Sequence, residues 1–103
     1  FDLTVRTSIS GVLREATFRN PHGHLTLDVT NAQGRVQTWT IETSAANLLR
    51  RRGWDFTKIR PGMRGTIVGH PNKTVPFNIY TREVRMADGT VFGDRYGNDT
   101  ALD

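Results

Sequence analysis

The sequence predicts an all-β domain with one short helix, and three observations support this fold class. Threonine, valine, isoleucine and phenylalanine recur in short segments, several of which alternate between apolar and polar residues. Glycine, proline, asparagine and aspartate separate these segments where tight turns would fall. Near the middle of the chain, one segment changes from a two-residue period to a run of alanine and leucine, which favours a helix.

The first two expected strands lie in the first third of the chain. Leu3–Phe18 is predicted to be one long strand, with a bulge or bend at Gly11. His24–Thr30 alternates strictly, so its apolar and polar residues would face opposite sides. The apolar side holds Leu25, Leu27 and Val29, and the polar side holds His24, Thr26 and Asp28.

A hairpin is expected to lead into the third strand. Asn31–Gly34 is the predicted turn, because Gly34 tolerates the positive φ that a short hairpin needs. Arg35–Thr43 is the return strand. Trp39 and Ile41 stand two residues apart on it and would share the face that packs on the core.

The predicted helix follows this strand directly and spans about two turns. Ser44 is a suitable N-cap, and the alanines and leucines after it favour helix. Arg50–Arg52 fall in the last turn, where the helix dipole prefers cations. Gly53 suits the position just past the end, and Trp54 is expected to fold back onto the helix.

Two more strands complete the expected fold. Arg60–Met63 has Pro and Gly at the centre of a type II turn and leads into a strand over Met63–His70. A loop and a strand over Phe77–Met86 follow, and Asp88-Gly89 makes a tight hairpin into a short last segment.

The order strand, strand, strand, helix, strand, strand is that of the OB-fold, a five-stranded Greek-key barrel. The helix between strands three and four is the specific part of this match. A six-stranded sandwich is the alternative. Residues 1–92 are expected to form one domain and residues 93–103 a polar C-terminal tail.

Composition limits the class of protein. The chain has 103 residues, 36% of them hydrophobic and 23% charged, which suits one globular domain. The lack of cysteine excludes disulfides and thiolate metal sites. No apolar run approaches the roughly 20 residues that span a bilayer. The net charge of +4 would attract polyanions or anionic lipid, or serve solubility alone.

Several segments together resemble an uncharacterised family of small exported proteins of Gram-negative bacteria, described only as a domain of unknown function. The resemblance covers roughly Val5 to Phe92, and its landmarks are NPHGHLTLDV, GRVQTWTIE, LLRRRGW, IRPGMRGTIVGHP and REVRMADG. It implies an OB-like domain of the periplasm, with a signal peptide already removed, and no established activity. Members often carry a His-His-Ser stretch after the signal peptide, which this chain, beginning at Phe1, lacks.

Three histidines are the candidate metal ligands. His22 and His24 stand two residues apart, so in extended chain they point the same way and would both reach one zinc or copper ion. His70 would join them if the end of strand four lies near the start of strand two. Asp28 or Glu42 would supply oxygen ligands or orient an imidazole. Alternatively, His22 satisfies loop groups and His24 lies on a solvated strand face.

A second hypothesis is a polyanion-binding module, because OB-folds bind oligonucleotides or oligosaccharides over strands two and three. The candidate ligand-binding residues are Trp39, Glu42, Arg50, Arg51, Arg52 and Trp54. The favoured interpretation of the two tryptophans is nevertheless structural, with Trp39 in the core and Trp54 packing after the helix. Nucleic acid is not the expected partner. The third hypothesis is a small hydrolase or isomerase. It ranks last because no catalytic sequence pattern stands out. The sequence therefore favours a small exported binding or accessory domain.

Overall fold

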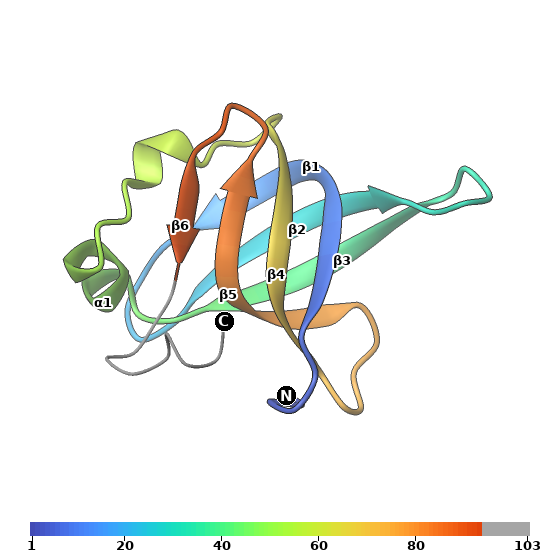
Figure 1. Cartoon of the computed structure of the whole chain (residues 1–103), viewed down its shortest axis with the longest axis horizontal. Coiled ribbons are helices and arrows are strands. Elements are labelled where there is room, and N and C mark those ends of the chain that lie inside the picture. Colours follow the sequence, from blue (N-terminus) through green and yellow to red (C-terminus); the bar gives the residue numbers. More distant parts are fainter. Residues whose placement is uncertain (94–103) are drawn as a thin grey trace.

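The computed structural model describes residues 1–93, which form six strands, one α-helix and one 3-10 helix (Figure 1). Their bounds are β1 Thr7–Thr17, β2 Gly23–Thr30, β3 Val36–Thr43, α1 Ala46–Arg51, η1 Phe56–Lys58, β4 Arg64–Pro71, β5 Asn78–Met86 and β6 Val91–Gly93. Of the predicted tail, Gly93 ends β6 and the rest lies outside the described residues.

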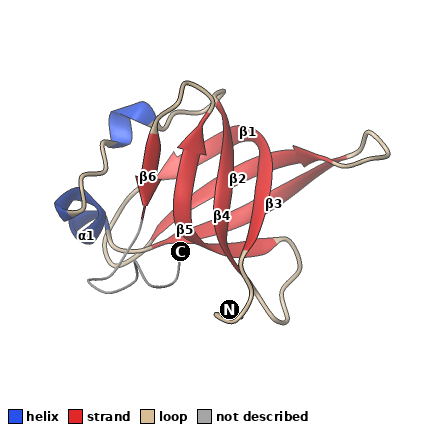
Figure 2. Cartoon of the chain, viewed as in Figure 1, coloured by secondary structure: helices blue, strands red, loops and turns tan. Residues whose placement is uncertain are grey.

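Five strands close into a barrel. The strand order is β3-β2-β1-β4-β5-β6, and β3 also pairs in parallel with β5 through Thr40–Glu42. This last pairing joins the two ends of the sheet, so β1 to β5 form a ring, and β6 extends β5 outside it (Figure 2). The predicted all-β fold class, with its helix between strands three and four, is confirmed, and the six-stranded sandwich is wrong.

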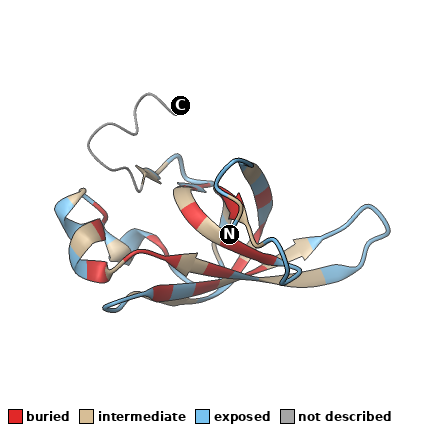
Figure 3. Cartoon of the chain, turned by 90° about the horizontal axis from the view of Figure 1, so that it is seen from below, coloured by how far each residue is buried: buried red, intermediate tan, exposed pale blue. Residues whose placement is uncertain are grey.

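The core fills the barrel, and the alternation predicted for β2 and β3 supplies much of it. Leu25, Leu27 and Ile41 are at most 1% exposed, and burying each such side chain stabilises the fold by roughly 1.5–3 kcal/mol. Buried and exposed positions alternate along the strands in Figure 3. Residues between the core positions, such as His24 and Glu42, therefore lie on the outer face.

Strand β1 bends as it passes from β4 to β2, and two of its residues allow this. A Cβ on Gly11 would stand 2.1 Å from the carbonyl oxygen of Asp28, so only glycine permits this approach of the two backbones. The register shifts by one residue after Leu13, which leaves Arg14 without a partner on β2. The sequence predicted a bulge or bend at Gly11, but the bulge lies at Arg14.

Residues 1–6, here called the N-terminal segment, do not extend β1. The sequence predicted a strand from Leu3, whereas β1 begins at Thr7. The backbone N–H of Asp2 instead donates to the carbonyl oxygen of Pro71 at 2.7 Å, at the end of β4. The ring of Phe1 lies 5.6 Å from the ring of Tyr80 on β5. The segment therefore packs against the outer side of β4 and β5.

The start of α1 differs from its prediction. Ser44 was expected to be the N-cap, but Ala45 occupies that position and has no side-chain cap. Ser44 is buried, and its hydroxyl forms a 2.5 Å hydrogen bond with the Tyr80 hydroxyl. The side-chain oxygen of Asn20 accepts from the Asn47 N–H at 3.0 Å, which ties the β1–β2 loop to the helix.

Candidate functional site

His70, near the end of β4, is a buried histidine with one nitrogen already engaged. It is 7% exposed, and its Nδ1 lies 2.8 Å from the carbonyl oxygen of Val5. A carbonyl oxygen only accepts hydrogen bonds, so Nδ1 carries the proton and donates it. In the neutral ring Nε2 is then an acceptor, and no described hydrogen bond in residues 1–93 involves it.

A cavity of about 370 Å³ lies beside His70, and we call it the His70 pocket. Its volume falls within the range of small-molecule sites. The described residues that line it come from the N-terminal segment, from β4 and from β5; they are Phe1, Leu3, His70, Tyr80 and Arg82. Most of the lining is apolar, and the polar groups are an imidazole, a phenol and a guanidinium.

A bulge in β5 lies at Arg82, one of the residues that line the pocket. Val68 pairs with Glu83 and Gly69 pairs with Thr81, so Arg82 is the extra residue of the bulge. Bulges of this kind redirect a side chain, and here Arg82 lines the same outer cavity as Tyr80. Gly69 lets the two strands approach, since a Cβ there would stand 1.9 Å from the Tyr80 carbonyl oxygen.

Among the described residues, two arginines and one aspartate lie near the pocket. Arg82 lines it, and Arg6 lines a neighbouring cavity of about 230 Å³ that shares Leu3 and His70 with it. Asp2 is the nearby acid, and its Oδ1 accepts from the Thr4 hydroxyl at 2.6 Å and from the Thr4 N–H at 3.0 Å. These two bonds lower the pKa of Asp2. Asp2 is therefore ionised at neutral pH and adds a negative charge near the two arginines.

The structure does not bring the three predicted metal ligands together. His22 is exposed in the β1–β2 loop, and His24 on β2 stands directly opposite Glu42 on β3. Strand β1 lies between β2 and β4. Thr17, at one end of β1, pairs with His24, whereas Thr7, at the other end, pairs with Gly69 beside His70, so His24 and His70 lie at opposite ends of β1. Within residues 1–93 there is no group of three or more His, Cys, Asp or Glu side chains that could hold an ion.

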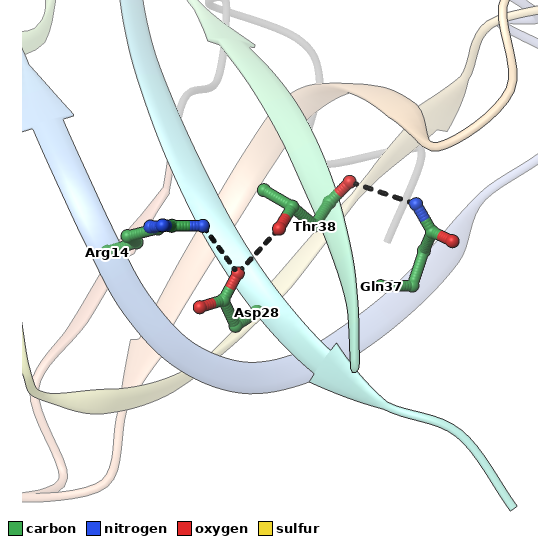
Figure 4. Close-up of polar contacts among 4 residues, drawn as sticks. All are labelled: Arg14, Asp28, Gln37 and Thr38. Carbon is green, nitrogen blue, oxygen red and sulfur yellow. Dashed lines mark hydrogen bonds and ion pairs between the residues drawn. The ribbon is translucent and has the colours of Figure 1, made fainter. Parts of the chain in front are cut away.

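Asp28, suggested as an oxygen ligand or as a partner for an imidazole, is engaged elsewhere (Figure 4). Its Oδ1 accepts from the Thr38 hydroxyl at 2.7 Å and lies 3.8 Å from the Arg14 guanidinium. The amide of Gln37 donates to the Thr38 carbonyl oxygen at 3.5 Å. The pair with Arg14 is largely exposed, so it adds at most about 1 kcal/mol of stability.

The two predicted aromatic contacts both pack within the protein. Trp39 is half-buried and meets Phe77 edge to face, with 5.5 Å between ring centroids. Trp54 is 5% exposed, and its indole N–H donates to the Gly93 carbonyl oxygen at 2.9 Å. Its ring stacks on Phe92. Trp54 is thus part of the core, as the alternative interpretation of this residue predicted.

The three predicted arginines have different surroundings. The Arg50 guanidinium lies 5.0 Å from the ring centre of Phe56. Arg51 is exposed and donates to the Asn47 carbonyl oxygen at 3.4 Å. Arg52 lines a separate cavity of about 370 Å³ beside β6. Each of the three arginines thus contacts a different part of the protein.

Residues 1–77 of the 103-residue chain match DUF6152, a family of unknown function. The chain belongs to this family. No curated protein matches it. In residues 1–93 no helix combines the length and the apolar character needed to cross a bilayer.

This DUF6152 chain needs more than its matched residues to form the barrel and the pocket. The match ends just before β5, yet β5 closes the ring and carries Tyr80 and Arg82. Sequence reasoning missed both residues, and also Phe1 and Leu3. A hairpin register extended from the loop after Pro71 would have placed Tyr80 opposite His70. No local pattern indicates where the N-terminal segment packs.

Proposed function

We propose that this protein is a small exported binding module of the periplasm, rather than an enzyme, and that it holds a small ligand in the His70 pocket. Its export is supported by the sequence landmarks described above. The binding role is supported by one observation: His70 is buried, its Nδ1 is held by Val5, and its ring lines a cavity. Such a ring offers a ligand one acceptor in a fixed position.

The chemistry of the walls fits a binding role. Phe1, Leu3 and the Tyr80 ring offer apolar surface, whose burial by a ligand contributes about 25 cal/mol per Å². His70 and Arg82 supply the few polar groups that orient a ligand in sites of this kind. The closed barrel holds β4 and β5 in place behind them.

Fragment screening by amide NMR of the full chain tests the binding site. We use a set of small aromatic fragments that are anionic, neutral or cationic. At least one fragment is expected to shift the amides of Leu3, His70 and Arg82, and a His70→Ala variant should lose these shifts. His24→Ala, a change to an exposed histidine, is the matched control and should keep them. Shifts confined to other surfaces, or none at all, contradict the proposal.

Cell fractionation tests the location. The full-length gene product, expressed in a Gram-negative host, is expected in the periplasmic fraction, together with a periplasmic marker enzyme. Recovery in the cytoplasmic fraction alone contradicts export and leaves the binding proposal to be judged separately.

A metal site at His22 and His24 is the second candidate function. It is favoured by the register, which sets His24 opposite Glu42 with the exposed His22 two residues earlier. The described residues give no set of three ligands, so water would complete the coordination of copper or zinc. Calorimetric titration with Cu(II) and Zn(II) is expected to give heat that His24→Ala removes and His70→Gln retains. No heat with the wild type rejects this candidate.

A further inference from the structure

We infer that this protein has a second binding site, which takes a phosphate group on the outer face of β1, β4 and β5. The site is a cavity of about 250 Å³ at the end of the sheet where β4 begins and β5 ends. Arg64 begins β4 and His70 lies near its other end, so this site is separate from the His70 pocket. The described lining residues are Ser10, Gly11, Arg64, Gly65, Thr66, Arg85, Met86 and Ala87.

The strand register makes this cavity a groove between side chains of the outer face. Ser10 pairs with Thr66, and Thr66 pairs with Arg85, so these three side chains form one row across the strands. Arg64 lies two residues before Thr66 on the same face, roughly 7 Å away. Between them, two glycines of the lining pair with each other. The floor of the groove is therefore backbone, which lets a small group approach the sheet closely.

The charged groups that line this groove are two guanidiniums, and its described lining holds no carboxylate. Arg64 is exposed, and its side chain has no hydrogen bond or ion pair with any of residues 1–93. Arg85 is also exposed, but its Nε donates to Glu83 Oε1 at 2.6 Å. That bond leaves the two terminal nitrogens of Arg85 to donate to a ligand.

The acids nearest in sequence are both engaged outside the groove. Glu83 binds Arg85 and lines a different cavity beside β6. Asp88 accepts from the Thr90 N–H at 2.9 Å. Its hydrogen bonds with Thr90, and to a smaller extent the charge of Lys58, lower the pKa of Asp88. The two arginines and this lysine, set against the two acids, leave one positive charge, which attracts an anion.

A pair of hydroxyls adds a neutral donor. Ser10 Oγ and Thr66 Oγ1 lie 2.7 Å apart, and either can donate to the other. Each hydroxyl has one proton, so the accepting member of the pair keeps its own proton for a ligand. No other hydrogen bond of these two hydroxyls is described in residues 1–93. This donor lies in the same row as Arg85.

Donors on several sides favour a phosphate group over a carboxylate. A planar carboxylate has two oxygens, and a single guanidinium satisfies both. A phosphate group presents three or four oxygens in different directions, so it suits two guanidiniums and a hydroxyl together. Because Ser10, Arg64 and Arg85 are exposed, the groove is open to solvent. It therefore admits inorganic phosphate or the phosphate end of a larger molecule.

Titrations of the full chain near neutral pH test this site, followed by amide NMR with sodium chloride holding the ionic strength constant. The probes are inorganic phosphate, methyl phosphate and acetate. We expect phosphate to shift the amides of Gly11, Gly65 and Thr66 along a saturating curve, and acetate to bind about tenfold more weakly. Methyl phosphate that binds as tightly as inorganic phosphate supports the end of a larger molecule as the ligand, and weaker binding supports free phosphate.

Variants assign the binding to residues. Arg64→Gln and Arg85→Gln should each weaken phosphate binding about tenfold. Arg35→Gln removes the same charge from an exposed arginine between β2 and β3, so it is the matched control and should keep the affinity. Ser10→Ala combined with Thr66→Val removes both hydroxyls without a change of charge and should weaken binding about fivefold.

Three results would overturn this inference. They are equal losses in Arg35→Gln and Arg64→Gln, acetate binding as tight as phosphate binding, and no saturating shift at the three amides. Each would leave the proposed function of the His70 pocket unaffected, because that pocket lies at the other end of β4.

Discussion

The Nδ1–H of His70 donates to the carbonyl oxygen of Val5 at 2.8 Å, across 65 positions of the chain. This bond joins the end of β4 to the N-terminal segment. A second link, from the Asp2 N–H to the Pro71 carbonyl oxygen, lies at the same end of β4. Two hydrogen bonds thus position the segment that supplies two walls of the His70 pocket.

Replacing His70 should loosen this segment. In His70→Phe the Val5 carbonyl oxygen loses its donor, so we expect a loss of about 1 kcal/mol in the free energy of unfolding. Amide hydrogen exchange should also become faster at Asp2. Urea unfolding and exchange NMR measure the two effects. His24→Ala is the control, since an exposed side chain of this kind changes stability by no more than about 0.5 kcal/mol. Equal effects of the two variants would contradict the role given to the bond.

The close approach of β4 and β5 makes Gly69 the more sensitive of two glycines. Gly69→Ala would set a Cβ 1.9 Å from the Tyr80 carbonyl oxygen, so the strands must separate and stability should fall by about 3 kcal/mol or more. Gly34→Ala meets no atom within 4 Å and suffers only from its φ of 79°, a cost of about 1 kcal/mol. Urea midpoints compare the two, and a smaller loss for Gly69→Ala would refute the packing described for β4 and β5.

Acid should weaken the start of η1. The Thr57 hydroxyl, and then its N–H, hydrogen-bond to Asp55 and lower the pKa of this carboxyl below its ordinary value. A lowered pKa in the folded state stabilises it above the unfolded pKa, and that stability is lost as pH falls through the folded value. Between pH 6 and pH 3, Asp55→Asn should therefore lose less stability than the wild type. Urea titrations at both pH values test this, and an unchanged loss in the variant would count against it.

Polyanion binding should depend on total charge rather than on α1. Because Arg50, Arg51 and Arg52 have different surroundings, Arg51→Gln and Arg35→Gln are expected to lower the salt concentration of elution from heparin equally. Both side chains are exposed, and both changes remove one positive charge. A larger effect of Arg51→Gln than of Arg35→Gln would contradict this expectation and support the basic binding site that the sequence predicted at the helix.

The barrel was predictable because its signals are local. Apolar residues two apart, such as Leu25 and Leu27, face the core as the alternation predicted. Gly34 and Gly62 have the positive φ angles that their turns were expected to need. The helix lies between strands three and four, as expected, since its alanines and leucines break the two-residue period. Each of these features depends on a few neighbouring residues.

What sequence reasoning missed depends on contacts between distant residues. An extra residue in a strand leaves no mark on composition, so the bulges at Arg14 and Arg82 were not located. Ser44 has the side chain of an N-cap, but a hydroxyl 36 residues away engages it. His70 was singled out as a metal ligand because it is one of three histidines. Its bond to Val5 and its pocket follow only from the folded chain.

The pairing of β3 with β5 covers three residue pairs, whereas every other joint of the ring has five or more. The β3–β5 pairing, which closes the barrel, is therefore its shortest strand pairing. Tyr80, the last residue of β5 in this pairing, also lines the His70 pocket. Local opening favours regions with few hydrogen bonds between strands, so we expect the ring to open first between β3 and β5. Such an opening would also move Tyr80 and, with it, one wall of the His70 pocket.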